Sequence, residues 1–180
     1  MSTSVPVLGE TLVDAVSIRR RVAELAAEID AHYADARSPI VLLCVLKGSL
    51  IFTADLARFI TVPVEIDFIA VRSYGAGARS DGRVEMVKDA DLRLRGRDVL
   101  LVEDVVDTGH TVAFLQTHLA QRGARSVRCV TLLDKTSRRV REVHIDWAGF
   151  AIPDRFVVGY GLDYGERYRN LADVRVLDGV

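Results

Sequence analysis

The sequence lacks both an excess of charge and any long apolar run. Its 24 lysines and arginines nearly balance its 25 aspartates and glutamates, and the two signs are interspersed. We therefore expect no general electrostatic attraction to nucleic acid or to anionic membranes. No stretch approaches the roughly 18 apolar residues that a membrane span requires, and the chain does not begin with a basic segment followed by an apolar one. These absences predict a cytoplasmic protein that binds neither nucleic acid nor membrane.

Cysteine is also scarce. Cys44 and Cys129 are the only two, each lies in an apolar run typical of a buried strand, and they have no metal-ligand spacing. We expect reduced thiols in the core. Apolar residues make up 49% of the chain, which is enough for a substantial core. No repeat, low-complexity tract or linker divides the sequence, so we predict a single domain over residues 1–180.

A helix and then a strand–turn–helix unit are predicted in the first third of the chain. From Asp14 to about His32 apolar residues recur at helical spacing, namely Val16, Val22, Leu25, Ala26 and Ile29. The arginines at 19–21 could bind a polyanion, but the balanced charge favours a solvated helix face. The apolar run 40–46 predicts a buried strand, and helical spacing resumes through Phe59.

The pattern then predicts a hairpin and further strands. The segment VEIDFIAVRSYG, which begins at residue 64, alternates around Ile66, Phe68 and Ala70. The glycine-rich polar stretch GAGARSDGR, up to residue 83, follows as a loop, and 84–89 resumes strand-like alternation. Further strands are predicted at 99–102, 126–135 and 155–164, with a helix through Val112, Leu115 and Leu119 that stops at Gly123 and a connector around Trp147, Gly149 and Pro153. Strands that alternate with helices indicate a mainly parallel sheet covered on both faces.

In such sheets ligands bind beyond the carboxyl ends of the strands, so the residues that follow each apolar run should converge on one crevice. These residues are Lys47-Gly48-Ser49, Glu103-Asp104, Asp107 to Thr111, Asp134-Lys135 and Asp163-Tyr164.

The segment VLLVEDVVDTGHT carries the most specific pattern. Backbone N–H groups and hydroxyls of Thr108–Thr111, at the positive end of a helix, can hold a phosphate monoester, and Gly109 lets the backbone approach closely. Two adjacent acids, Glu103 and Asp104, are costly at the end of a buried strand unless hydroxyls or a hard cation use their oxygens. A ribose diol with Mg²⁺ fits both demands. The simpler interpretation is that these acids are solvated or cap the helix.

This segment resembles the signature of the phosphoribosyltransferase family that uses 5-phosphoribosyl pyrophosphate: a hydrophobic strand, two acids, a short apolar pair, then Asp-Thr/Ser-Gly-x-Thr. The resemblance extends to the hypoxanthine(-guanine) branch, because LKGS, RSYG, LLDK, FVVGYGLDY and YRNL occur in the family's order between Ile40 and Leu171. It implies an α/β fold of the type I phosphoribosyltransferase kind, Rossmann-like, with a central sheet flanked by helices, a small hood from the chain ends and a flexible hairpin loop.

The resemblance assigns roles on the phosphoribosyl pyrophosphate side. Residues 46–48 form the pyrophosphate loop, often with a strained peptide bond before Lys47, and Arg169 binds the same group. Glu103 and Asp104 hold the ribose hydroxyls and a Mg²⁺, and Asp107 is the general base or acid, although it could simply cap the helix. His110 occupies a variable position and is not expected to be catalytic. The complete set expected to bind this substrate is Lys47, Gly48, Glu103, Asp104, Asp107, Thr108, Gly109, His110, Thr111 and Arg169.

On the purine side the resemblance implies that Lys135 donates to a 6-oxo group and that Phe156 stacks on the base. Alone, Lys135 could be a surface residue and Phe156 a core residue. Asp163 would bind a second Mg²⁺ on pyrophosphate, and Arg169 could instead form a surface ion pair. The purine-binding set is Lys135, Phe156, Val157, Asp163 and Val105, the metal set is Glu103, Asp104 and Asp163, and the lid is formed by Ser73 and Tyr74.

The implied activity is purine salvage, in which hypoxanthine, and guanine as well, receives the 5-phosphoribosyl group. A xanthine-preferring transferase is one alternative, and an RNA-binding regulator on the same scaffold is another. The regulator would need a basic face, which the near-neutral charge argues against. The expected partners are a purine base, phosphoribosyl pyrophosphate and Mg²⁺, and the resemblance suggests a homodimer or homotetramer.

Overall fold

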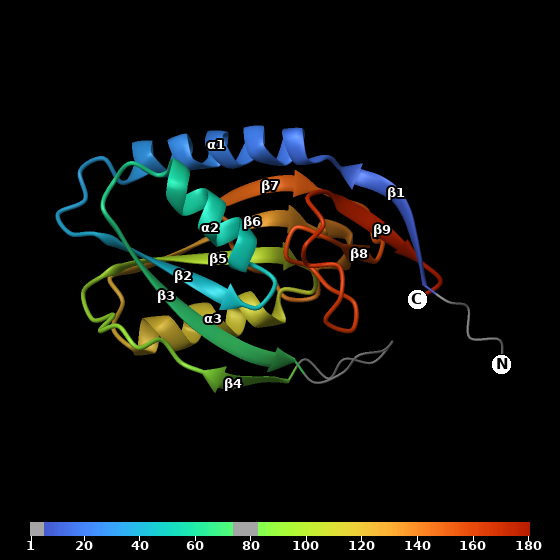
Figure 1. Cartoon of the computed structure of the whole chain (residues 1–180). Helices are drawn as coiled ribbons and strands as arrows, with labels where there is room; N and C mark the ends of the chain where they lie inside the picture. The colour runs from blue at the N-terminus through green and yellow to red at the C-terminus, as the bar shows by residue number, and fades with distance from the viewer. Residues whose placement is uncertain (1–5, 74–82) are drawn as a thin grey trace.

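A six-stranded sheet forms the centre of the fold in the computed structural model, which describes residues 6–73 and 83–180 (Figure 1). The strand order is β4-β3-β2-β5-β6-β7, and every neighbouring pair is parallel except β3 and β4. Its strands are β2 (Ile40–Leu46), β3 (Val64–Ser73), β4 (Val84–Lys88), β5 (Asp98–Val106), β6 (Ser126–Asp134) and β7 (Trp147–Ala151). The predicted α/β class with a mainly parallel sheet is therefore confirmed.

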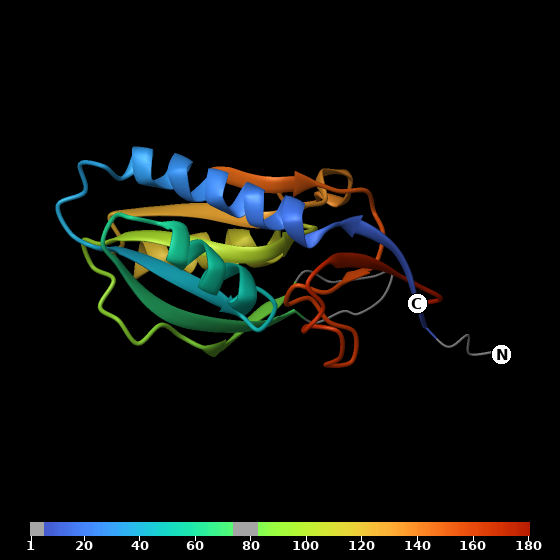
Figure 2. The ribbon, with the colours of Figure 1, turned by 45° about the horizontal axis from the view of Figure 1, so that its top comes forward.

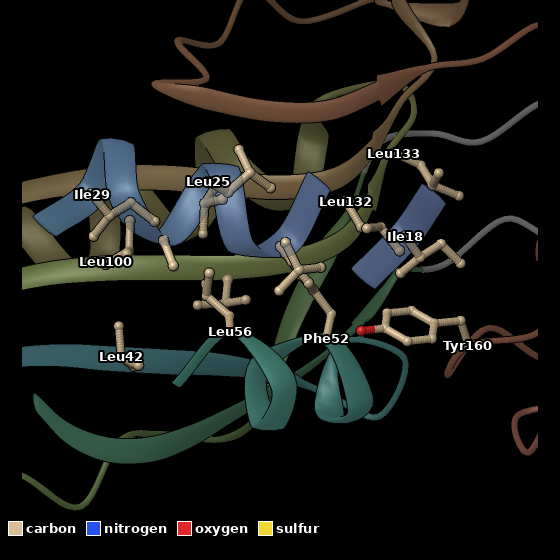
Figure 3. Packing of buried hydrophobic residues seen from close by; sticks show 14 of the residues in the cluster. Ile18, Leu25, Ile29, Leu42, Phe52, Leu56, Leu100, Leu132, Leu133 and Tyr160 are labelled. Atoms are coloured by element: carbon tan, nitrogen blue, oxygen red, sulfur yellow. The ribbon is translucent and has the colours of Figure 1, made fainter. Parts of the chain in front are cut away.

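Helices cover both faces of this sheet, as the continuous apolar runs predicted. Helices α1 (Ala15–His32) and α2 (Leu50–Phe59) pack on one face, where Figure 3 shows their apolar side chains against Leu42 and Leu100. Helix α3 (His110–Gln121) covers the other face, where Leu43 and Leu101 contribute to a second core cluster. Because successive strand residues point to opposite faces, one apolar run feeds both clusters.

A second, three-stranded sheet lies beyond the carboxyl ends of the parallel strands. It has the order β1-β9-β8 and joins β1 (Val7–Val13) to β9 (Val174–Asp178) and β8 (Val157–Val158), all antiparallel. Figure 2 shows these segments, from near both ends of the chain, side by side at one end of the molecule. This sheet is the hood that the family resemblance implied.

The expected hairpin is present, but its buried face is the opposite one. Strands β3 and β4 pair antiparallel, from Ala70 opposite Lys88 to Ser73 opposite Val84. Ile66 is 46% exposed, whereas Asp67 and Ile69 are buried. Asp67 fits there because its carboxylate accepts the backbone N–H groups of Phe68 and Leu92. The proposed lid residue Tyr74 and most of the loop 75–83 lie outside the described residues.

Two predictions of secondary structure were wrong. The connector around Trp147 contains edge strand β7, which Arg21 of α1 fixes by donating to the carbonyls of Ala148 and Gly149 at 2.9 and 3.2 Å. Conversely, only Val157–Val158 of the predicted strand at 155–164 is a strand, and it belongs to the hood because glycines at 159 and 161 turn the chain.

Two details of α1 also differ from the prediction. Val16 is 80% exposed and Ile18 takes the buried position near the start of the helix. Within the arginine triplet, Arg21 is partly buried against β7 rather than fully solvated. Both cysteines are free and buried, as expected. In the part of the chain that the structure describes, none of the helices has the length and apolar character needed to cross a membrane.

Candidate active site

Polar residues gather at the carboxyl edge of the parallel sheet, as the rule for such sheets predicts. The loop after β2 carries Lys47, the end of β5 carries Glu103 and Asp104, and the residue after β6 is Lys135. In Figure 1 the arrowheads of β2, β5 and β6 point toward the hood and toward the loop that follows β8. Residues from distant parts of the sequence therefore surround one end of the sheet.

Two acids end β5: Glu103 is buried, and Asp104 is half-buried with Arg169 as a nearby cation, but no described cation lowers the pKa of Glu103. Glu103 is 5% exposed, and its Oε1 is buried with no hydrogen-bond partner. Burial, followed by the charge of Asp104, raises the pKa of Glu103 well above its usual value. Burial likewise raises the pKa of Asp104 to about 6, although the backbone N–H of Val105 donates to its carboxylate. Buried acids left in this state are candidates for binding hydroxyls or a cation.

Asp104 is pressed against the loop that follows β2. A Cβ on Gly48 would overlap the Asp104 carboxylate, and a Cβ on Gly161 would overlap the carbonyl of Gly48. The peptide bond between Leu46 and Lys47 is cis. The loop at 46–48 thus packs against the Asp104 side chain on one side and against the backbone at Gly161 on the other. Only glycine at positions 48 and 161 permits these close approaches.

The turn before α3 has the form of an anion site. Gly109 caps the helix with φ of 87°, where a Cβ would approach the carbonyl of Arg141 to 2.6 Å. The carbonyl of Thr108 accepts the backbone N–H groups of Val140 and Arg141, and the Thr108 hydroxyl lies 3.1 Å from Nδ1 of His110. The first turn of α3 holds no acidic residue, so its free N–H groups and positive end favour an anion such as phosphate.

Asp107 stands at the mouth of this turn. Its Oδ1 lies 3.1 Å from Nε of Arg138, whose Nη1 in turn lies 3.4 Å from Oδ2 of Asp154. The side chain of Asp107 is 38% exposed, so a ligand in the crevice can reach it. Pattern reasoning had not found Arg138, because it lies in a short 3₁₀ turn, Thr136–Arg138, with no strand or helix signal of its own.

A cluster of charged side chains lies beside the loop at 46–48. Nη2 of Arg169 lies 2.8 Å from Oδ1 of Asp163 and 3.1 Å from Oε2 of Glu166, and its Nη1 donates to the carbonyl of Gly161 at 2.7 Å. Nζ of Lys47 lies 3.0 Å from Oε1 of Glu166. The arrangement brings Lys47, Asp163 and Arg169 together, and it adds Glu166, which the sequence pattern had not singled out.

The residues expected to bind a purine are spread over two segments. Lys135 is 9% exposed, and its backbone N–H donates to the carbonyl of Val106. Phe156 is 44% exposed and meets Tyr164 edge to face, with ring centroids 5.7 Å apart. The alternative interpretations, a surface Lys135 and a core Phe156, are therefore both wrong. Val157 is buried in β8, and Val105 packs against the first core cluster.

The donor set for a metal is small. Among residues 6–73 and 83–180, no group of three or more His, Cys, Asp or Glu side chains could hold a metal ion. Mg²⁺ typically uses one or two carboxylates together with substrate oxygens and water. Glu103, with its unpaired buried oxygen, and Asp104 fit a Mg²⁺ that arrives with a polyanionic substrate.

Comparison with known proteins decides the family. The family model of the phosphoribosyl transferase domain matches residues 9–165. The chain belongs to the phosphoribosyltransferases. It is 45% identical over 162 residues to the hypoxanthine phosphoribosyltransferase of Salmonella typhimurium, which covers 90% of this chain and 91% of that protein.

Solved structures of phosphoribosyltransferases share the fold. A hypoxanthine-guanine phosphoribosyltransferase from Bacillus anthracis, with HEPES in its active site, has a TM-score of 0.88 and 39% identity, covering 94% of this chain and 99% of that one. A hypoxanthine phosphoribosyl transferase from Trypanosoma cruzi, whose C-terminal region was studied for oligomeric state and activity, has a TM-score of 0.88 and 41% identity, with coverage of 94% and 91%. The resemblance drawn from the sequence motifs is confirmed.

Proposed function

We propose that this phosphoribosyltransferase transfers the 5-phosphoribosyl group of phosphoribosyl pyrophosphate to hypoxanthine, and also to guanine, forming IMP or GMP and pyrophosphate. The observation that carries the proposal is one edge of the sheet that combines a helix amino end suited to an anion, a buried Glu103 beside a half-buried Asp104, and the cations Lys47 and Arg169. These three features match the 5′-phosphate, the ribose diol and the pyrophosphate of a single substrate.

Electrostatics and positioning supply most of the proposed catalysis. The turn at 108–111 holds the 5′-phosphate, and the acids at 103 and 104 hold the ribose hydroxyls. Lys47 and Arg169 stabilise the negative charge of departing pyrophosphate while positive charge develops at C1 of the ribose. A Mg²⁺ held by Glu103 and Asp104, with a second at Asp163, would neutralise further phosphate charge. The purine N9 then bonds to C1.

Asp107 is the proposed general base. Its carboxylate takes the purine N7 proton as N9 forms its bond, which relieves positive charge on the base. Its partial exposure at the mouth of the phosphate turn supports this role. Arg138 contacts the Asp107 carboxylate in the free enzyme, and in this role it would help to position the base.

The proposed selectivity for 6-oxopurines follows from the hydrogen-bond donors around the purine site. The ammonium of Lys135 donates to a 6-oxo group but finds no acceptor in the 6-amino group of adenine. Phe156 is accessible enough to stack on the base, and backbone groups at Val157 and Asp163 read its edge. We further propose that Ser73 and Tyr74 belong to a lid that excludes water, and that the enzyme works in the cytoplasm as a homodimer or homotetramer. The oligomeric proposal draws support from the Trypanosoma cruzi relative.

The deciding experiment is nucleotide formation from phosphoribosyl pyrophosphate with each of hypoxanthine, guanine, xanthine and adenine, with and without Mg²⁺. We expect Mg²⁺-dependent product with hypoxanthine and guanine, and little with adenine. A preference for xanthine would change the assigned substrate. The absence of nucleotide with every base, together with salt-sensitive binding of RNA, would favour the regulator instead.

A further inference from the structure

Glu166 bridges the two cations of the proposed pyrophosphate site, with one carboxylate oxygen for each. Oε1 lies 3.0 Å from Nζ of Lys47, and Oε2 lies 3.1 Å from Nη2 of Arg169. Lys47 and Glu166 are 119 positions apart in the sequence, so the bridge joins two separate loops. It places two anionic oxygens between the same two side chains that the mechanism assigns to a diphosphate.

The turn that carries Glu166 holds this side chain in place. Glu166 has φ of 64°, a backbone conformation that residues other than glycine rarely adopt. Its backbone N–H donates to Oδ2 of Asp163 at 2.9 Å, and Tyr164 and Arg167 exchange backbone hydrogen bonds across the turn. The turn thus fixes the backbone position from which the Glu166 side chain reaches the two cations.

The bridge is accessible to an incoming anion. The side chains of Lys47 and Glu166 are both 65% exposed, and exposed ion pairs are weak because water competes for them. A diphosphate carries more charge and more acceptor oxygens than a carboxylate, so it can replace Glu166 at both cations.

We propose that Glu166 acts as a surrogate anion: in the free enzyme its carboxylate occupies the place of the pyrophosphate group between Lys47 and Arg169, and substrate must displace it. This inference rests on the proposed function, since it takes the two cations to be the pyrophosphate site. Glu166 acts through these cations and sets how tightly the site holds pyrophosphate, before the reaction and after it.

Whether loss of the Glu166 charge tightens or weakens pyrophosphate binding follows from the other contacts that hold Arg169. Without the Glu166 carboxylate, Arg169 keeps its contacts with Asp163 and with the carbonyl of Gly161. Removal of the charge therefore costs little in positioning Arg169, while it removes a competitor and a nearby negative charge. Glu166→Gln keeps the size of the side chain and should tighten the binding of pyrophosphate and of phosphoribosyl pyrophosphate.

The test compares the unmodified enzyme with Glu166→Gln and with Glu24→Gln as a matched control. Glu24 on α1 also contacts two cations, Arg20 and Arg21, and its side chain is 50% exposed. The probes are inorganic pyrophosphate with Mg²⁺ in calorimetric titration and initial rates with hypoxanthine. We expect the Kd of pyrophosphate and the KM of phosphoribosyl pyrophosphate to fall about threefold to tenfold in Glu166→Gln, with the KM of hypoxanthine and the Tm unchanged. The control should match the unmodified enzyme.

A purely structural role would give a different result. In that case Glu166→Gln would lower the Tm or raise the KM of phosphoribosyl pyrophosphate, and either a raised or an unchanged pyrophosphate Kd overturns the inference. The difference between variant and unmodified enzyme should also shrink as salt is added, because it is electrostatic. A difference that persists at high salt contradicts the proposed competition.

Arg169→Gln separates this inference from the function on which it rests. If Arg169→Gln weakens pyrophosphate binding and Glu166→Gln does not tighten it, the surrogate-anion role is wrong and the proposed site stands. If Arg169→Gln leaves pyrophosphate binding unchanged, the assignment of the site itself is wrong.

Discussion

Buried carboxylates at the two ends of the parallel sheet differ in whether they are paired with a cation. At the amino end, Asp98 begins β5 and accepts from Nε of Arg125 at 2.9 Å and from the Ser126 hydroxyl at 2.7 Å. Asp146, which precedes β7, pairs with Arg128 and accepts the backbone N–H of Cys129. At the carboxyl end, Glu103 keeps a buried oxygen without a partner.

The difference separates stability from function. A buried carboxylate that is paired and hydrogen-bonded supports the fold, whereas one without a cation costs free energy until a ligand satisfies it. The same strands β5 and β6 therefore carry paired carboxylates at one end and the proposed ligand-binding residues at the other. Four variants break or sharpen this contrast.

The largest effect is expected at Asp107. Asp107→Asn removes the proposed base, so kcat should fall by roughly 10²- to 10⁴-fold, with a smaller change in the KM of phosphoribosyl pyrophosphate. Steady-state kinetics with hypoxanthine measure both. Arg138→Gln is the control, because it breaks the same ion pair but keeps the carboxylate. Equal losses in the two variants would assign Asp107 to ion pairing and remove it from the proton transfer.

A stability effect without a direct catalytic one is expected at the opposite end. Asp146→Asn should lower the free energy of unfolding by about 2 kcal/mol, since it leaves Arg128 without its charge partner, and Arg128 is itself partly exposed. Urea unfolding measures the change. The kinetic constants at a temperature where both proteins are folded should match, and a loss of kcat there would contradict the division between the two ends.

At Glu103 we expect a substitution to raise stability and to weaken substrate binding. Glu103→Gln replaces a buried, unpaired acid with a neutral side chain of the same shape, so the free energy of unfolding at about pH 8 should rise by ~1 kcal/mol. The KM of phosphoribosyl pyrophosphate should rise as well, because a ligand for the ribose and Mg²⁺ is lost. Urea unfolding without substrate and kinetics with substrate are the two measurements. A less stable Glu103→Gln would show that the acid supports the fold.

The smallest effect concerns acid stability. The hydrogen bond from Arg125 holds the pKa of Asp98 below the usual value for an aspartate. A lowered folded-state pKa means that the stabilisation is complete above the unfolded pKa and is lost as pH falls through the folded one. The advantage of the unmodified protein over Asp98→Asn should thus be constant above about pH 4 and shrink below it. Denaturant unfolding across this range, with exposed Asp91→Asn as control, tests it; an advantage that persists at low pH would contradict it.

Sequence patterns predicted the inner strands better than the edges. The runs 40–46 and 99–102 are apolar because both faces are buried, and residues 129–133 of the predicted strand 126–135 are buried as well. This signal needs no knowledge of the neighbouring segments. Strand β7 is only half-buried and depends on Arg21 from α1, so its own residues carry little signal. In β3 the sequence pattern predicted the wrong buried face, because Asp67 is polar and yet buried. Its carboxylate is satisfied by two backbone N–H groups.

The site followed the same logic. Residues that end a parallel strand, such as Lys47 and Glu103, could be placed at one edge from the strand order alone. Arg138 and Glu166 could not, because each acquires its place from an ion pair with a distant segment. Long-range charge pairing leaves no periodic trace in a sequence.

Gly161 packs on Gly48, and Gly48 packs on Asp104, so that two loops and the end of β5 form one block with no room for a Cβ at either glycine. A displacement of the loop at Gly161 would therefore press on the loop at Gly48 and, through it, on Asp104. Even one methyl group at either glycine would spread the layers. Under the proposed roles, the base, the leaving group and the ribose would all bind against this one block of packed residues.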